Sequence, residues 1–259
     1  MGAKMYSGDV VRAGQTGAFN AVKANLRLFA GLMVAALALW QGANLLDPLH
    51  FVQVVNGAGH VSMRMHESPM HMVLRNTVLD FFSAFIAAPA MIAVHRHVLL
   101  GEDGRVWDDK PRMLRFASFY FVVSFVVYEL PVLSTNQNPF ICFPAVLAAY
   151  WIMGRLVPAY PALALDVPGA VVTGFKLSNH HWWFIVRVMI IGLLPTLLLM
   201  MIVGVIGAIF MALAGQHNVS VHLDVLAVLG GLLGLFISTV GAGLASELYR
   251  KFGGLAQPA

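Results

Sequence analysis

The chain has 259 residues, of which 59% are hydrophobic and 11% are charged, and its mean hydropathy is +0.78. A soluble domain carries roughly 25% charged and about 45–50% apolar residues, so this composition excludes a soluble globular protein. The same high hydrophobicity excludes a disordered chain. We therefore expect a polytopic membrane protein. The single cysteine, Cys142, excludes an internal disulfide framework and a metal site built from several thiolates.

Six apolar segments are each long enough to cross a bilayer, which takes about 20 residues per helix. The sequence therefore predicts an all-α fold, a bundle of six transmembrane helices that forms one membrane domain over residues 1–259. The predicted spans cover residues 26–46, 77–94, 116–133, 139–157, 184–214 and 223–246.

Two stretches outside the spans, residues 9–27 and 167–183, are predicted to be amphipathic helices on the membrane surface. The first alternates small, apolar and basic residues, which is typical of a helix lying in the interface. The second begins after a proline break and ends in Trp182-Trp183. Tryptophan favours the head-group level because its ring is apolar and has a polar edge.

The positive charges indicate the orientation of the bundle. With six spans, 14 of the 16 Lys and Arg residues fall on one side, and only Arg64 and Arg75 fall on the other. Cytoplasmic loops of membrane proteins are enriched in Lys and Arg, so we expect both termini in the cytoplasm and the chain in a bacterial inner membrane. These bases would contact anionic lipid head groups. No basic stripe interleaved with aromatic residues is present, so we expect no nucleic-acid partner.

The first non-cytoplasmic loop, residues 47–75, is rich in histidine and methionine. Thioether and imidazole groups are the ligands that suit Cu(I), so this loop is a candidate copper site. Its candidate ligands are His60, Met63, Met65, His66, Met70, His71 and Met72. The structural alternative is that methionine serves here as an adaptable filler in a loop that folds over the mouth of the bundle.

The cytoplasmic loop after the second span, residues 95–115, mixes acidic residues with five bases. Asp108 and Asp109 could hold a divalent ion, but the neighbouring Lys110 and Arg112 neutralise their charges more simply. We therefore predict a solvated loop that binds a protein partner. Its surface would comprise Gly101, Glu102, Asp103, Asp108 and Asp109.

Two acidic residues fall inside the predicted spans, Asp80 and Glu129. Charged groups at the membrane centre are costly and are often functional. Both residues are predicted near the outer ends of their spans, within reach of water, so we favour structural roles over an ion or proton pathway. Small residues at Gly204 and at Gly230 to Gly234 predict close helix packing, within the bundle in preference to a homo-oligomer.

Two passages carry a resemblance to a known family. They are residues 94–102 (VHRHVLLGE) and residues 170–178 (AVVTGFKLS), the second leading through His181-Trp182-Trp183 into the fifth span. Together they resemble alphaproteobacterial six-span membrane proteins, which are in turn similar to the membrane domain of glycerophosphodiester phosphodiesterases. The resemblance implies a six-helix membrane module. It does not imply phosphodiesterase activity, because that chemistry belongs to a separate soluble domain for which this chain has no room.

No motif in the sequence indicates an enzyme. The Gly-x-Ser-x-Gly, phosphate-loop and His-Glu-x-x-His patterns do not occur. We expect a non-enzymatic scaffold, assembly factor or accessory subunit, without a cofactor, in a membrane protein complex or homo-oligomer. One alternative is copper handling through the Met/His loop. Another is a lipid or small-solute carrier, with residues 136–138 and Ser238-Thr239 as its polar groups.

Overall fold

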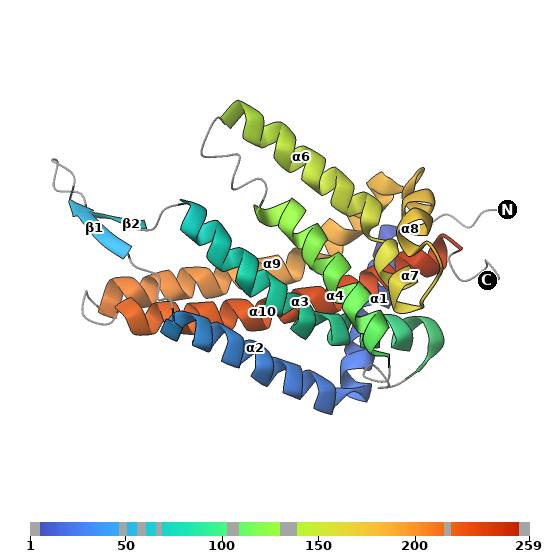
Figure 1. The fold of residues 1–259 in the computed structure, drawn as a ribbon, viewed down its shortest axis with the longest axis horizontal. Coiled ribbons are helices and arrows are strands. Elements are labelled where there is room, and N and C mark those ends of the chain that lie inside the picture. Colours follow the sequence, from blue (N-terminus) through green and yellow to red (C-terminus); the bar gives the residue numbers. More distant parts are fainter. Residues whose placement is uncertain are drawn as a thin grey trace.

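The computed structural model describes residues 6–46, 51–55, 61–65, 69–102, 109–129, 139–214 and 219–253. Its longer helical segments run side by side in an elongated bundle, as Figure 1 shows. These segments are α2 (Leu26–Leu46), α3 (Pro69–Leu100), α4 (Lys110–Ser124) continued by the π-helix η1 (Phe125–Glu129), α6 (Pro139–Leu156), α9 (Trp182–Ala214) and α10 (Val219–Lys251). Three further helices lie at one end of the bundle, namely α1 (Ser7–Ala24), α7 (Ala159–Ala164) and α8 (Ala170–Ser178).

Within the described part of the chain, four helices are long and apolar enough to cross a membrane. The segments are Leu26–Ala43, Val73–Leu100, Trp182–Ile206 and Leu232–Lys251. This confirms the prediction of a mainly helical protein with membrane-spanning helices. The remaining two predicted spans coincide with α4 plus η1 and with α6, and the count of six spans stays a prediction.

A β-hairpin lies where the sequence predicted only a loop. Strand β1 (Phe51–Val55) pairs antiparallel with β2 (Val61–Met65), so that Phe51 lies opposite Met65 and Val55 opposite Val61. The described chain is otherwise helical, as the all-α fold class predicts, and this hairpin is an exception that was not predicted. The cause is local, because valines at alternate positions favour an extended, pleated backbone. The hairpin lies at the end of the bundle opposite to α7 and α8 (Figure 1).

Helix α1 has one buried face and runs across the end of the bundle (Figure 1). Its buried residues recur every three or four positions, as expected of an amphipathic helix; they are Val10, Val11, Gly14, Ala18 and Ala21. This face packs mainly against α10, and also against α3 and α9. The predicted amphipathic helix is therefore an integral part of the helix packing.

Glycines allow the closest helix contacts. A Cβ atom added to Gly243 of α10 would lie 2.3 Å from the carbonyl oxygen of Gly14 in α1. A Cβ on Gly174 of α8 would lie 2.6 Å from the backbone nitrogen of Ala159 in α7. Glycine at such positions lets two backbones approach each other. These contacts fix α1 and α8 against the bundle.

The centre of the bundle is formed by α3 and α10, which are joined by a buried polar pair. His95 is fully buried, and its Nδ1 lies 2.7 Å from Ser246 Oγ. Since the Ser246 hydroxyl donates to the carbonyl of Ala242, it accepts the bond from His95 Nδ1–H. Buried polar groups are nearly always paired in this way, so the pair fixes the register of α3 on α10.

Candidate functional site

A polar pocket of about 150 Å³ lies between α2, α3, α4 and α10. Four of its side chains carry oxygen: Asp80 and Ser83 from α3, Tyr120 from α4 and Ser238 from α10. Asp80 and Ser83 are three residues apart and so share one face of α3. Three helices that are distant in the sequence thus supply the polar groups.

The pocket lies well inside the candidate membrane spans. Ala36, which lines it, is near the middle of the segment Leu26–Ala43. Asp80 is seven residues inside the start of Val73–Leu100, which is about 10 Å along a helix. Sequence analysis placed Asp80 near the outer end of its span; α3, however, begins at Pro69, before the predicted span, and continues to Leu100.

One hydrogen bond joins two walls of the pocket. The hydroxyl oxygens of Tyr120 and Ser238 are 3.1 Å apart. Ser238 Oγ donates to the carbonyl of Gly234 at 2.9 Å, so Tyr120 is the donor to Ser238. The Tyr120 hydroxyl also forms a hydrogen bond with Ser124, and its oxygen has a second lone pair for another donor or a cation.

The two α3 side chains lack such bonds. Among the described residues, none forms a hydrogen bond or an ion pair with the Asp80 carboxylate. Ser83 Oγ is buried and has no hydrogen-bond partner in the described part of the chain. Acidic groups inside a membrane usually pair with a cation or mark a binding site. The arrangement therefore suits a small cation or a hydrogen-bond donor.

A second, apolar cavity of about 120 Å³ adjoins this pocket. Its walls include Met91, Met153 and Met189, together with Tyr120 and Ser238 from the polar pocket. The two spaces meet at the Tyr120–Ser238 hydrogen bond. Together they reach from α2 on one side of the bundle to α6 and α9 on the other.

The predicted partner loop is described at its two ends. Gly101 ends α3 with φ +69° and donates its N–H to the carbonyl of His97 at 3.0 Å. Glu102 pairs with Arg96. Asp109 caps α4, because its Oδ1 accepts the N–H of Arg112 at 3.0 Å. The carboxylates of Glu102 and Asp109 therefore already have partners within the chain. Asp103 and Asp108 lie outside the described residues, and the partner surface stays a prediction.

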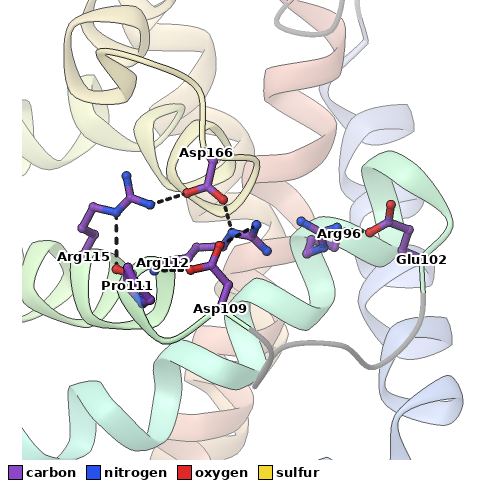
Figure 2. A network of polar contacts seen from close by, with 7 residues as sticks. All are labelled: Arg96, Glu102, Asp109, Pro111, Arg112, Arg115 and Asp166. Atoms are coloured by element: carbon purple, nitrogen blue, oxygen red, sulfur yellow. Dashed lines mark hydrogen bonds and ion pairs between the residues drawn. The ribbon is translucent and has the colours of Figure 1, made fainter.

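Figure 2 shows how the start of α4 is bound to the α7–α8 connection. Arg112 bonds to Asp166 through its Nε and lies 2.9 Å from Asp109 Oδ2 through Nη2. Arg115 reaches the other Asp166 oxygen at 2.8 Å. Asp166 has φ +57°, a left-handed conformation that aspartate tolerates better than most residues. The cluster ties two connections together at the end of the bundle where α7 and α8 lie.

The candidate copper ligands fall into two groups. Met63 and Met65 are in β2, whereas Met70, His71 and Met72 are in the first turn of α3, where Met70 and His71 are exposed. His60 and His66 lie outside the described residues. Within the described part of the chain, no three His, Cys, Asp or Glu side chains form a group that could hold a metal ion. Copper binding stays a prediction.

Sequence reasoning missed Ser83 and Tyr120, and it named Ser238 without its neighbours. The helical spacing of Asp80 and Ser83 was the signal for the α3 side of the pocket. Nothing in the sequence indicates which helix faces them. Thr239, the other nominated residue, bonds to the carbonyl of Leu235 and lines a different groove.

Comparisons of the chain with protein-family models, with curated proteins and with solved structures find no match. The resemblance to the membrane domain of glycerophosphodiester phosphodiesterases therefore rests on residues 94–102 and 170–183 alone.

Proposed function

We propose that this chain is a six-span protein of the bacterial cytoplasmic membrane that binds a small cation at Asp80 and carries it through the bundle. The observation that carries the proposal is the Asp80 carboxylate, which lies inside a candidate span and has no cationic partner among the described residues. A carboxylate held away from water is strongly destabilised unless a positive charge compensates it. A bound cation would supply that charge.

The size and the donor set of the pocket define the class of cation. A volume of 150 Å³ has room for several water molecules, because about 10–15 Å³ of such space is enough to hold one. This suits an alkali ion with part of its hydration shell, or a short alkylammonium ion. Oxygen atoms are the ligands that hard cations prefer. Ser83 and Tyr120 offer hydroxyl oxygens next to the carboxylate.

The distribution of basic residues supports cytoplasmic termini. Helix α1, the end of α3, the start of α4, the helices α7 and α8 and the end of α10 all lie at one end of the bundle (Figure 1). Most of the described Lys and Arg residues belong to these segments, namely Arg12, Lys23, Arg96, Lys110, Arg112, Arg115, Lys176, Arg250 and Lys251. By the positive-inside rule this end faces the cytoplasm.

Cation-dependent stability tests the binding site. The thermal unfolding midpoint of the purified protein would be compared in NaCl, KCl and methylammonium chloride, with N-methylglucamine chloride at equal ionic strength as reference. We expect a rise with at least one of the small cations, since a ligand at 100 times its Kd stabilises by about 2.7 kcal/mol. Asp80→Asn should abolish the rise. Asp9→Asn, at an exposed position in the first turn of α1, should retain it.

A midpoint that is the same in all four salts for the wild-type protein would overturn the proposal. So would a cation effect that survives Asp80→Asn. Carriage is tested separately, by uptake of the stabilising cation into proteoliposomes. Uptake that depends on Asp80 supports a carrier. If the protein binds the cation without taking it up, the transport part of the proposal is wrong and the binding part stands.

The scaffold or accessory-subunit function is a second candidate, favoured by one glycine. Gly204 of α9 has no described atom within 4 Å of an added Cβ, unlike Gly14 and Gly243. Such an open glycine suits the approach of a helix from another chain. Cross-linking in native membranes through Gly204→Cys, in a Cys142→Ser background, would detect a neighbour. An adduct at Gly204 and none at the packed Gly192 would support this function.

A further inference from the structure

A large apolar groove lies on the other side of α10 from the polar pocket. It encloses about 500 Å³ between α1, α2, α9 and α10, within the range of about 300–1,000 Å³ that ligand sites occupy. Its lining is almost entirely apolar and includes Phe19, Met33, Leu199 and Phe236. It runs along α10 from Val240 to Leu232, which is about 12 Å of helix.

The groove opens toward the bilayer and begins at α1. Its two outer walls, α2 and α9, are largely exposed along their candidate spans. At the α1 end, Gln15 donates to the carbonyl of Gly192 at 2.9 Å and joins α1 to α9. The groove thus starts at the helix that crosses the end of the bundle and extends from there along the candidate spans.

A positive charge lies at this edge. Lys23 of α1 is exposed, and its Nζ is 4.5 Å from the centroid of the Phe19 ring, which lines the groove. Arg27, one turn further along the chain, is also exposed. The α1 end of the apolar groove is therefore flanked by two positively charged side chains, Lys23 and Arg27.

We propose that this groove binds one anionic glycerophospholipid, with an acyl chain between α2, α9 and α10 and its phosphate beside Lys23. The apolar lining matches a hydrocarbon chain, and the lysine selects a negative head group over a zwitterionic one. A basic residue near an anionic lipid head group contributes about 1 kcal/mol. The inference concerns a site separate from Asp80 and does not depend on cation binding there.

Lipid retention by the purified full-length protein tests the site, with native mass spectrometry as the readout. The probes are phosphatidylglycerol and phosphatidylcholine of equal chain length, added separately. We expect retention of one phosphatidylglycerol, and weaker retention of phosphatidylcholine. Lys23→Gln should lower phosphatidylglycerol retention about fivefold, and Leu199→Trp, which fills the groove from an exposed wall position, should lower retention of both lipids.

Two matched variants serve as controls. Lys176→Gln removes an exposed lysine of α8, and Leu198→Trp enlarges an exposed neighbour of Leu199 that does not line the groove. Both should retain phosphatidylglycerol as the wild type does. Equal retention in all variants, or equal retention of the two lipids by the wild type, would overturn the proposal. A dimer that Leu199→Trp dissociates, with phosphatidylglycerol retention unchanged, would assign the groove to a second copy of the chain instead.

Discussion

Helices α9 and α10 have the same length, 33 residues, but opposite places in the bundle. The candidate span in α9 is the most apolar of the four, yet only 12% of it is buried within the protein. The candidate span in α10 is the least apolar, and 61% of it is buried. In a soluble protein the most apolar helix would be the innermost one.

The reversal follows from the solvent. Lipid tails are as apolar as leucine, so apolar surface gains nothing by leaving them, and helix contacts in a membrane rely on small residues and hydrogen bonds. Helix α10 supplies both, through Gly243 and through Ser238 and Ser246. Helix α9 carries leucines and isoleucines that are exposed in the structure.

The glycines of the two helices should respond to alanine in opposite directions. Gly243→Ala places a Cβ within 2.3 Å of the Gly14 backbone oxygen, and we expect a loss of about 3 kcal/mol in stability. Gly204→Ala meets open space and should gain about 0.5–1 kcal/mol from helix propensity. Thermal unfolding in detergent measures both. Equal midpoints would show that α1 does not pack on α10 as described.

A second contrast is between a buried and an exposed arginine side chain. Arg155 is buried at the end of α6; its Nη2 donates to Asn179 Oδ1 at 3.0 Å, and its guanidinium lies 4.7 Å from the Phe175 ring centroid. Arg155→Lys loses the planar donor geometry and should cost about 2 kcal/mol. Arg187→Lys, at an exposed position on α9, should change stability little. Similar losses in the two variants would argue against the buried contact.

Breaking the His95–Ser246 hydrogen bond should lower the stability of the protein by less than Gly243→Ala or Arg155→Lys does. A second substitution, at His95, should restore part of that stability. Ser246→Ala leaves the buried Nδ1–H of His95 without an acceptor, which should cost about 1.5 kcal/mol. Adding His95→Leu removes the unpaired donor and should recover part of that stability. Chemical denaturation of the two variants and the wild type checks this order. A double variant that is less stable than Ser246→Ala would contradict it.

The smallest loss of stability is expected from a substitution at Asp166, which lies at the end of the bundle formed by α7 and α8 (Figure 2). Asp166→Asn keeps a residue that tolerates φ +57° but removes the charge that Arg112 and Arg115 share. We expect a loss of about 0.5 kcal/mol at low salt that becomes smaller near 1 M salt, because ion pairs at the protein surface are weak and screened, and Asp166 lies partly exposed there. A salt-independent loss would indicate a packing role for the carboxylate.

The sequence was sufficient for the helices and insufficient for their contacts. Residues 26–46 and 139–157 matched α2 and α6 almost to the residue, because apolar runs with clear polar ends define a helix by themselves. The hairpin was not predicted, because alternating valines over five residues are a weak signal beside the His and Met residues of the same segment. The predicted second span ends at residue 94, whereas α3 continues to Leu100 with the polar residues Arg96 and His97 inside the helix.

The candidate pocket illustrates the limit more sharply. Asp80 and Ser238 were both noticed in the sequence, one as an edge residue and the other as a weak polar group. Their meeting depends on the packing of α3, α4 and α10, which is set by contacts between residues more than 100 positions apart, such as Tyr120 and Ser238. No periodicity in one helix encodes such a pairing.

The contact between Gly14 and Gly243 joins the two ends of the chain, which are separated by about 230 residues. At a synthesis rate of about 5–20 residues per second, α1 emerges from the ribosome roughly 10–50 s before α10, the helix against which it mainly packs. Helices α3 and α9, its other neighbours, are synthesised earlier than α10. The packing of α1 is therefore completed only when α10 is made, and a chain interrupted before α10 would lack the Gly14–Gly243 contact.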